Sequence, residues 1–156
     1  MTSGYDAFIF DLGGTLVAIE GDEIATDGAR RVRLLPGVAE ALRALRGRPV
    51  FVITNQQGVA LGTLTEAEAR GFVEQLDAAS GGVLTDHRIC MHLAAAGCPC
   101  RKPRPGMLLD LARAHGLDLA RCLMVGDSES DRRCAEAAGV GAFGWAEAFF
   151  SRGAPD

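Results

Sequence analysis

Four short, mostly apolar runs recur along the chain, and each is followed by polar residues or glycine. They cover residues 8–10, 49–53, 88–91 and 122–125. Runs of this length without a polar alternation are typical of strands that are buried on both faces of a parallel sheet. A fifth, weaker run at residues 140–143 predicts an edge strand.

Between these runs, apolar residues recur every three or four positions, which predicts helices. Thr65 and Glu68 form a capping box at the start of the second helix. Residues 17–35 are polar and have no clear period, so we expect a loop or small flap there, too short for a separate cap domain. The alternation of strands and helices predicts a three-layer, doubly wound, Rossmann-like α/β fold with a mostly parallel sheet. The expected helices run over residues 36–47, 65–80, 105–116 and 131–139.

Charged and hydroxyl side chains stand where the predicted strands end. They are, in order, Asp11, Thr54, Lys102, Asp127 and Asp131. Because the carboxyl ends of parallel strands meet at one edge of a sheet, we expect these side chains to lie together. Carboxylates suit Mg²⁺, and the glycines Gly13 and Gly14 let backbone amides approach phosphate closely. Each residue alone is more often an ordinary turn or surface residue, so the prediction depends on their order.

A separate cluster of metal-binding residue types follows the third apolar run. The sequence Cys90-x-His92-x5-Cys98-x-Cys100 offers three thiolates and one imidazole, a closed set of four ligands that suits tetrahedral structural zinc. Two other interpretations remain: a few buried cysteines beside a loop histidine, or a redox pair at Cys98 and Cys100. Zinc is the favoured interpretation, because closely spaced ligand pairs are typical of zinc sites.

Composition narrows the class of protein. The chain has 156 residues, is 48% hydrophobic and 23% charged, and carries a net charge of −4. One globular domain over residues 1–156 is expected. The negative charge argues against a nucleic-acid face, and no apolar run reaches the length of a membrane span. We therefore expect a cytoplasmic protein that binds no nucleic acid and no membrane. The sequence makes no prediction about protein partners. Cys122 and Cys134 are interpreted as buried packing residues.

The order Asp11, Thr54, Lys102 and Gly126-Asp127-x3-Asp131 closely resembles the four motifs of the haloacid dehalogenase superfamily. Residues 52–60 and 98–108 resemble more narrowly its small capless subgroup. That subgroup includes the D-glycero-D-manno-heptose 1,7-bisphosphate phosphatases and the histidinol-phosphate phosphatases. The resemblance covers almost the whole chain, from about Tyr5 to Phe143.

This resemblance implies a phosphatase mechanism at the predicted edge of the sheet. Asp11 would be the nucleophile that forms an aspartyl-phosphate. Mg²⁺ would bind Asp11, the Gly13 carbonyl and Asp127, while Asp131 would support the metal or Lys102. Thus Asp11, Gly13, Asp127 and Asp131 form the expected magnesium site.

The resemblance also assigns the phosphate and substrate contacts. Thr54 and Lys102 would hold the phosphate during transfer, and Asn55 and Arg101 would lie near the leaving group. The heptose-bisphosphate phosphatases carry a zinc loop with the same ligand pattern, longer than the one here. Because Lys102 lies two residues after Cys100, a structural zinc would hold the Arg101-Lys102 pair over the phosphate.

One position departs from the family pattern. Phosphatases of this superfamily usually carry a second Asp two residues after the nucleophile, where it protonates the leaving oxygen and later activates water. Here that residue is Gly13. Loss of a general acid/base typically costs a factor of ~10²–10⁴ in rate. Gly13→Asp is therefore expected to raise phosphatase activity, unless another acid already serves.

Three explanations of this departure remain open. A slow phosphatase would use solvent or another acid, such as Glu129 or a flap carboxylate (Glu20, Asp22 or Glu23). A pseudoenzyme would bind phosphate and metal without turnover. Different chemistry, such as dehalogenation or phosphonate cleavage, is disfavoured by the zinc loop and by residues 54–56. We therefore predict a Mg²⁺-dependent phosphatase that acts on a small phosphorylated metabolite, a sugar phosphate or bisphosphate, with the pseudoenzyme as the alternative.

Overall fold

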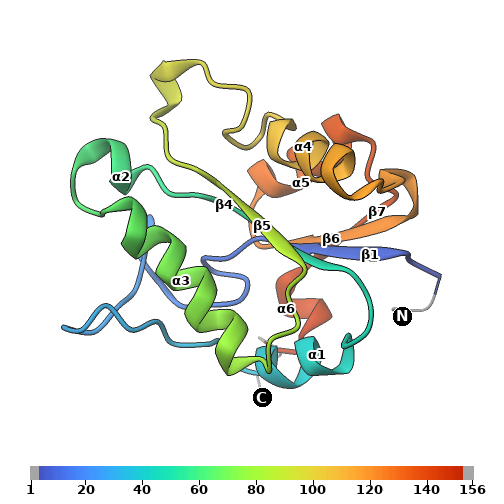
Figure 1. Cartoon of the computed structure of the whole chain (residues 1–156), viewed down its shortest axis with the longest axis horizontal. Coiled ribbons are helices and arrows are strands. Elements are labelled where there is room, and N and C mark those ends of the chain that lie inside the picture. The colour runs from blue at the N-terminus through green and yellow to red at the C-terminus, as the bar shows by residue number, and fades with distance from the viewer. Residues whose placement is uncertain (1–3, 153–156) are drawn as a thin grey trace.

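The computed structural model of the chain describes residues 4–152, and its centre is a five-stranded parallel sheet (Figure 1). The strand order is β5-β4-β1-β6-β7, and every neighbouring pair is parallel. The predicted doubly wound, mostly parallel sheet is therefore confirmed. The strands are β1 (Ala7–Phe10), β4 (Val50–Asn55), β5 (Asp86–Cys90), β6 (Cys122–Gly126) and β7 (Ala142–Trp145).

Helices cover both faces of the sheet, which gives the three expected layers (Figure 1). One face carries α1 (Val38–Ala44), α3 (Glu66–Ala79) and α6 (Ala146–Phe149), and the other carries α4 (Gly106–His115) and α5 (Glu129–Ala138). The short elements outside these layers are α2 (Gly58–Leu61) and the 3₁₀ turns η1 (Ala94–Ala96) and η2 (Leu119–Arg121).

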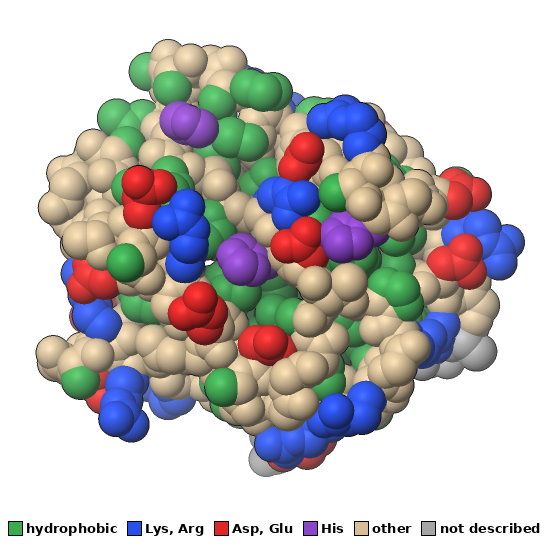
Figure 2. All heavy atoms as spheres, viewed as in Figure 1, with side chains coloured by type: hydrophobic (Ala, Val, Ile, Leu, Met, Phe, Trp, Pro, Cys, Tyr) green, Lys and Arg blue, Asp and Glu red, His purple; other side chains and the backbone are tan. Residues whose placement is uncertain are grey.

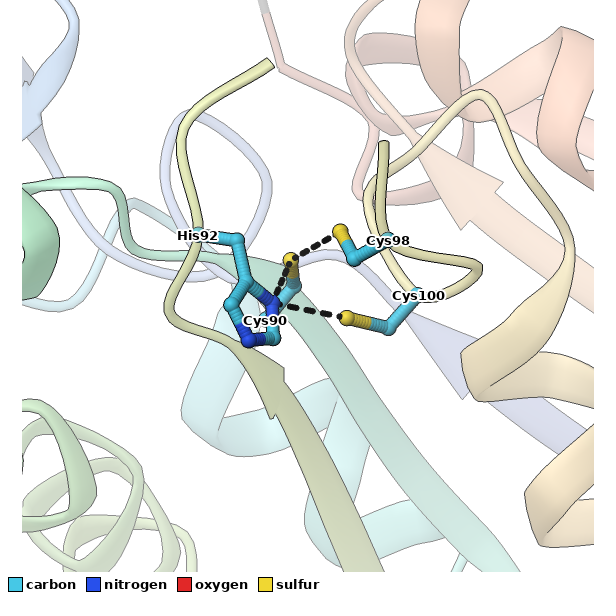
Figure 3. Close-up of side chains that lie close together, drawn as sticks. All are labelled: Cys90, His92, Cys98 and Cys100. Carbon is cyan, nitrogen blue, oxygen red and sulfur yellow. Dashed lines mark hydrogen bonds between the residues drawn. The ribbon is translucent and has the colours of Figure 1, made fainter. Parts of the chain in front are cut away.

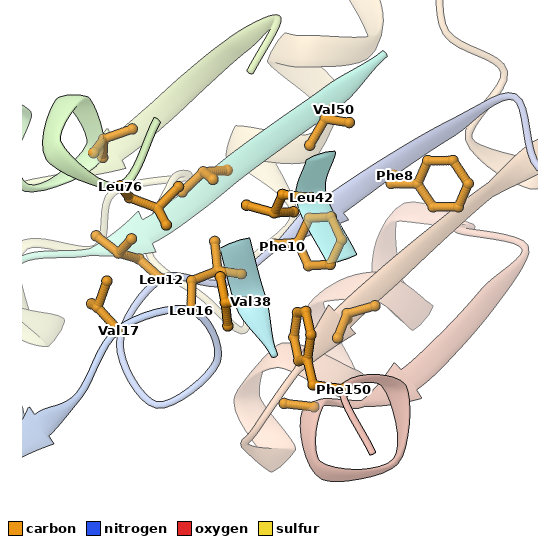
Figure 4. Packing of buried hydrophobic residues seen from close by; sticks show 14 of the residues in the cluster. Phe8, Phe10, Leu12, Leu16, Val17, Val38, Leu42, Val50, Leu76 and Phe150 are labelled. Carbon is orange, nitrogen blue, oxygen red and sulfur yellow. The ribbon is translucent and has the colours of Figure 1, made fainter. Parts of the chain in front are cut away.

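Alternate side chains of the central strand point into opposite layers. Phe8 and Phe10 of β1 join a cluster with the helices α1, α3 and α6, where Phe10 packs beside Phe150 (Figure 4). Ala7 and Ile9 join a second cluster with α4 and α5. All four side chains of β1 are fully buried. Burial on both faces explains why the sequence of this strand is continuously apolar.

β1 lies where the order of the strands reverses. From β1 the chain moves outward to β4 and β5, then crosses to β6 on the other side of β1 and ends the sheet at β7. In open α/β sheets, such a reversal leaves a crevice at the carboxyl ends of the strands, where ligands bind. Asp11 follows directly after β1, so the topology places it at this crevice.

Residues 17–35 form the flap, which the sequence predicted as an irregular segment or small flap. It contains a short antiparallel hairpin, β2 (Ile19–Glu20) and β3 (Glu23–Ile24), in which Ile19 pairs with Ile24. Strands of two residues are too short to show an alternating pattern. The hairpin therefore had no signal in the sequence.

The sheet edges differ from the expected boundaries. β5 begins at Asp86, two residues before the expected start, because Asp86 and His87 also pair with β4. Polar side chains of β5 contact α4. Arg88 Nε donates to Asp110 Oδ2 at 2.5 Å, and His115 Nε2 lies 2.8 Å from Asp86 Oδ2. β7 lies two residues later than expected, and α6 was not expected at all.

Capping boxes start two of the helices. At α3, Thr65 Oγ1 accepts from the Glu68 amide at 3.0 Å and Glu68 Oε1 accepts from the Thr65 amide at 2.9 Å, as predicted. A second box, formed by Ser128 and Asp131, starts α5 at Glu129. This helix therefore begins two residues before the expected start, because the sequence analysis did not recognise Ser128 as a cap.

Among residues 4–152, no helix is long and apolar enough to cross a bilayer. On the face seen in Figure 2, acidic and basic side chains are interspersed. That face therefore presents no broad field of a single charge.

Candidate active site and metal centre

An open cavity of about 390 Å³ lies at the carboxyl edge of the sheet. Small-molecule sites commonly have volumes of ~300–1,000 Å³, so the cavity can hold a small phosphorylated metabolite. The cavity brings together residues at or after the ends of four different strands. The sequence predicted that these side chains would lie close together. Those residues are Asp11, Thr54, Asn55, Arg101, Lys102 and Asp127.

Lys102 is a buried cation between two carboxylates. Its Nζ donates to Asp11 Oδ1 at 2.6 Å and to Asp131 Oδ1 at 2.7 Å, and its side chain is 4% exposed. Burial opposes the ammonium charge, but the two carboxylates outweigh it and raise the pKa of Lys102 above its ordinary value. Lys102 is therefore a fixed positive charge beside Asp11, suited to hold a phosphate.

The buried carboxyl of Asp11 requires a positive partner to ionise. Burial raises the pKa of Asp11 well above its ordinary value; Lys102 lowers the pKa, and Asp131 raises it again. A divalent cation beside this carboxyl would favour the ionised form that a nucleophile needs. Oxygen atoms of Asp11, Asp127 and Asp131 lie within 4.8 Å of one another. This donor set fits Mg²⁺, which prefers oxygen ligands.

Both oxygens of the Asp131 carboxylate already have partners. Oδ1 accepts from Lys102, while Oδ2 accepts from the amides of Asp127 and Ser128 at 3.1 and 3.2 Å and from Ser128 Oγ at 3.0 Å. Asp131 is fully buried and does not line the cavity. Of the two expected roles, support of Lys102 is favoured over direct contact with the metal.

Asp127 approaches the backbone next to Asp11 very closely. A Cβ built on Gly14 would lie 2.1 Å from Asp127 Oδ2, and Gly14 has φ +80°, so glycine is required there. Thr15 Oγ1 donates to Asp127 Oδ1 at 3.2 Å and lies 3.4 Å from Asp11 Oδ2. Gly14 and the Thr15 hydroxyl therefore hold Asp127 close to Asp11, the other expected metal ligand.

Thr54 places its hydroxyl at the end of β4. The residue is 2% exposed, and its Oγ1 accepts from Gln56 Nε2 at 2.9 Å. Because that bond uses a lone pair, the hydroxyl hydrogen of Thr54 stays available for a phosphate oxygen. Gln56, which the sequence analysis did not assign a role, thus orients the threonine.

Asn55 contacts the backbone of Lys102. Its Oδ1 accepts from the Lys102 amide at 3.1 Å, and its Nδ2 donates to the Lys102 carbonyl at 3.3 Å. The family resemblance implied that Asn55 lies near the leaving group. Asn55 does line the cavity, but both ends of its side-chain amide are used to hold Lys102. A contact between residues so far apart in the chain had no sequence signal.

The four expected zinc ligands converge after β5 (Figure 3). His92 Nδ1 lies 3.4 Å from Cys90 Sγ and 3.2 Å from Cys100 Sγ, and the Sγ atoms of Cys90 and Cys98 are 3.6 Å apart. Ligands placed ~2.0–2.3 Å from a common tetrahedral centre lie about 3.5–3.8 Å from one another. Sulfurs in a disulfide are only ~2.05 Å apart. The distances in the cluster are within a few tenths of an ångström of these values, so the cluster fits a tetrahedral metal ion, and its cysteines form no disulfide.

The thiols of Cys98 and Cys100 differ in pKa. Burial, together with the nearby Cys90 and Cys98 thiols, raises the pKa of Cys100 to about 12. Burial also acts against ionisation of Cys98, but hydrogen bonds led by the Arg101 amide lower its pKa to about 6. Three thiolates packed this closely need a cation to offset their mutual repulsion. The chemistry of the donors thus agrees with their geometry.

Arg101 joins the cysteine cluster to the cavity. Its Nη1 donates to the His92 carbonyl at 3.2 Å, and Arg101 also lines the cavity next to Lys102. Gly106 packs against the Cys98–Cys100 turn, since a Cβ there would lie 2.2 Å from the Pro99 carbonyl oxygen. The segment that carries Arg101 and Lys102 therefore contacts the cysteine cluster directly.

The flap hairpin fills the space beside Gly13. A Cβ built on Gly13 would lie 2.8 Å from Ile19 Cγ2 and 2.9 Å from Ile24 Cδ1. The tip of the hairpin also reaches the cavity, where Asp22 is one of the lining residues. The position that carries an acid in the family pattern is therefore packed against apolar side chains.

Arg152 supports the Asp11 loop from the far end of the chain. Its Nη2 donates to the carbonyls of Thr15 at 2.5 Å and Gly14 at 3.3 Å. Its guanidinium also stacks 4.8 Å from the centre of the Phe150 ring. No local pattern marks such an arginine, so the sequence analysis had no means to find it.

Known proteins resemble this chain in sequence and in fold. The profile of the haloacid dehalogenase-like hydrolases matches residues 23–139. The D-glycero-beta-D-manno-heptose-1,7-bisphosphate 7-phosphatase of Rhodopseudomonas palustris is 40% identical over 126 residues, which cover 72% of this chain and 69% of that protein. The D-glycero-alpha-D-manno-heptose-1,7-bisphosphate 7-phosphatase of Mycobacterium tuberculosis is also 40% identical, over 72% of this chain but only 64% of its own length.

The solved D,D-heptose 1,7-bisphosphate phosphatase of B. bronchiseptica, complexed with magnesium and phosphate, has the same fold. It superposes with a TM-score of 0.80 at 32% identity, covering 88% of this chain and 78% of that one. The predicted enzyme class, a phosphoric monoester hydrolase, matches that of these relatives. Because the family profile covers well over half of the 156 residues, the chain belongs to the haloacid dehalogenase-like hydrolase family.

Proposed function

We propose that the chain is a Mg²⁺-dependent phosphatase that removes phosphate from a small sugar phosphate or bisphosphate through an aspartyl-phosphate on Asp11. The observation that carries this proposal is the convergence of Asp11, Thr54, Lys102 and Asp127 on one cavity. This set supplies a nucleophile, two donors for phosphate oxygens and a second carboxylate for a cation. Membership of the hydrolase family supports the same chemistry.

In the first step, an oxygen of the Asp11 carboxylate forms a bond to phosphorus and the ester oxygen leaves. Lys102 and Thr54 donate to the phosphate oxygens as negative charge moves onto them. Mg²⁺ held by Asp11, Asp127 and the Gly13 carbonyl would neutralise the phosphate and reduce its repulsion of the carboxylate. The support is that Lys102 Nζ already lies 2.6 Å from Asp11 Oδ1.

In the second step, water attacks the aspartyl-phosphate and releases inorganic phosphate. Both steps move a proton: one to the leaving oxygen, and one away from the attacking water. Gly13 has no side chain to carry that proton. The proposal therefore requires either solvent or another acid, and we expect the reaction to be slow if solvent alone serves.

A structural zinc ion bound by Cys90, His92, Cys98 and Cys100 is part of the proposal. Its support is the spacing of 3.2–3.6 Å between the ligand atoms. Zinc would act on the chemistry only indirectly, by holding the segment that carries Arg101 and Lys102. Its own contribution is to folding, because closed four-ligand sites stabilise the chain directly.

The relatives suggest which sugar phosphates to test first. Both the beta and the alpha heptose-1,7-bisphosphate 7-phosphatases are 40% identical to this chain, so neither anomer is favoured. Arg101 and Asn55 line the cavity at the expected leaving-group side. Both anomers of D-glycero-D-manno-heptose 1,7-bisphosphate are therefore the first substrates to test.

A second candidate function is phosphate binding without turnover. The observation that favours it is the packing of Ile19 and Ile24 against Gly13, because both side chains would have to shift to admit the usual acid. Such a pseudoenzyme would keep Lys102, Thr54 and the magnesium site. It would bind phosphate analogues with Mg²⁺ and release no phosphate from any ester.

The deciding experiment measures phosphate release from both heptose bisphosphates with Mg²⁺, covalent labelling of Asp11 by a radioactive substrate, and binding of the phosphate analogue beryllofluoride. We expect release by the natural protein and none by Asp11→Asn. Analogue binding without release would favour the pseudoenzyme. Label on another residue, or full activity of Asp11→Asn, would refute the proposed nucleophile.

A further inference from the structure

We propose that Asp22, at the tip of the flap hairpin, is the general acid and base of this phosphatase. The inference rests on the proposed function and names the group that replaces the acid missing at Gly13. Three observations lead to it: the space beside Gly13 is filled, one flap carboxylate lines the cavity, and the other candidate acids lie outside the cavity.

The flap is seated on the nucleophile loop by apolar contact. Ile19 and Ile24, which pair across the hairpin, both come within 2.9 Å of the Cβ position of Gly13. Any side chain at position 13 would push these residues away. Gly13 therefore lets the hairpin approach the nucleophile loop. The turn between Ile19 and Ile24 then lies at the cavity.

Asp22 is the carboxylate that this turn presents. Among residues 4–152, the acidic residues that line the cavity are Asp11, Asp22 and Asp127. Asp11 is the proposed nucleophile, and Asp127 is bound by Thr15 at the proposed magnesium site. Asp22 accepts no hydrogen bond and forms no ion pair within the described residues, so its carboxyl is available to substrate and water.

The other candidates from the sequence are positioned for different contacts. Glu129 pairs with Arg132 at 2.7 Å and does not line the cavity. Glu23 Oε1 accepts from Thr63 Oγ1 at 3.1 Å, on the side of the hairpin that faces α2. Glu20 is exposed and lies outside the cavity. The geometry thus selects one of the four carboxylates.

The proton balance closes over the two steps. As the phosphorus–oxygen ester bond breaks, the carboxylic acid of Asp22 gives its proton to the leaving alkoxide oxygen, which departs as an alcohol. The resulting Asp22 carboxylate then takes a proton from the water that attacks the aspartyl-phosphate. Inorganic phosphate leaves, Asp11 is restored as a carboxylate, and Asp22 is again a carboxylic acid.

The test compares Asp22→Asn with Glu20→Gln, which removes a carboxylate from the same hairpin outside the cavity. Two substrates are used: a heptose bisphosphate, whose alkoxide leaving group needs a proton, and 4-nitrophenyl phosphate, whose leaving group needs little. We expect Asp22→Asn to lower kcat/KM for the sugar phosphate by ~10²–10⁴. For Glu20→Gln, kcat/KM should stay close to the value of the natural protein.

The aryl substrate provides a readout that a merely structural role would not change. With it, Asp22→Asn should release a rapid burst of nitrophenolate and then turn over slowly, because the phosphoenzyme forms but lacks a base for water. A thermal melt equal to that of the natural protein would exclude misfolding. Asp22→Ser provides a second variant if the amide disturbs the turn.

The outcomes separate this inference from the proposed function. If the natural protein releases phosphate and Asp22→Asn matches Glu20→Gln on both substrates, the inference is wrong and the proposed function stands. If the natural protein releases no phosphate and Asp11 is never labelled, both are overturned. A selective loss with the sugar phosphate and a burst with the aryl phosphate would support both.

Discussion

Asn55 holds Lys102 in place through the backbone, with its carboxamide bonded to both the amide and the carbonyl of that one residue at 3.1 and 3.3 Å. These two hydrogen bonds join the end of β4 to the segment after the cysteine cluster. Since Lys102 Nζ contacts Asp11, the position of the phosphate-binding cation depends on a side-chain amide 47 positions away in the chain.

Asn55→Ala should therefore loosen Lys102 without removing any charge. We expect a loss of about 1–3 kcal/mol in the free energy of unfolding, because two backbone groups lose their partner. A displacement of ~1 Å at the reacting groups can lower the rate ~10²-fold, so kcat should fall more than KM rises. Urea unfolding and steady-state kinetics measure the two effects.

Gln57→Ala is the matched control for this prediction. Gln57 lines the same cavity, and within the described residues the hydrogen bonds of Lys102 go to Asn55, Asp11 and Asp131 rather than to the Gln57 side chain. It should change kcat by much less than Asn55→Ala does. Equal effects of the two variants would contradict the positioning role of Asn55.

Protein purified without added metal should contain about one zinc per chain, and Cys100→Ser should lose it. Because the closed site contributes to folding, a chelator should lower the melting temperature of the natural protein. Cys134→Ala, which removes a buried thiol outside the cluster, should keep its zinc. Zinc-free protein that melts at an unchanged temperature would argue against the metal centre.

Gly13→Asp should be destabilising by about 1–3 kcal/mol, since the new side chain overpacks the flap. Ile19→Ala removes Cγ2 and Ile24→Val removes Cδ1, the two atoms that a Cβ at position 13 would meet. The cost of Gly13→Asp should therefore be smaller in the Ile19→Ala, Ile24→Val background. A double-mutant cycle by urea unfolding tests this, and an equal cost in both backgrounds would refute the contact.

The same substitution should also bear on activity. In the Asp22→Asn background, Gly13→Asp supplies a carboxyl beside the nucleophile, so we expect it to raise phosphate release from the sugar phosphate. In natural protein, where Asp22 already serves, the gain should be smaller. Equal gains in the two backgrounds would show that the two carboxyls do not substitute for each other.

Asp86 should make stability depend on pH in the acid range. Burial opposes ionisation of this carboxyl, but hydrogen bonds from His115 and Arg88 lower its pKa well below the ordinary value. A carboxyl with a lowered pKa stabilises the fold above its unfolded pKa of ~3.9, and this contribution is lost as the pH falls toward the folded value. Asp86→Asn should therefore cost about 1 kcal/mol at pH 7, discounted for partial exposure.

The difference in unfolding free energy between Asp86→Asn and the natural protein should shrink as the pH falls below about 4. Metal loss in acid affects both proteins, so their difference isolates the carboxyl. A constant difference for Asp86→Asn between pH 7 and pH 3 would contradict the prediction.

The sequence by itself determined the layered fold and the composition of its catalytic edge. Strands such as β1 are buried on both faces, so they are uninterrupted apolar runs, and the residue after each run had to fall at the carboxyl edge. Ligand pairs in the cysteine cluster are close in the chain, so their spacing alone predicted a four-ligand set. These features depend on local order, which sequence patterns report directly.

Only the tertiary structure decided which groups act on one another across that edge. The contacts of Asn55 with Lys102, Arg152 with Thr15, and Asp131 with Lys102 join residues that are 29 to 137 positions apart. The sequence left four replacement acids open because nothing local distinguishes Asp22 from Glu20. The choice among them follows from how the flap packs on Gly13, and that packing depends on apolar contacts between separate segments rather than on any local pattern.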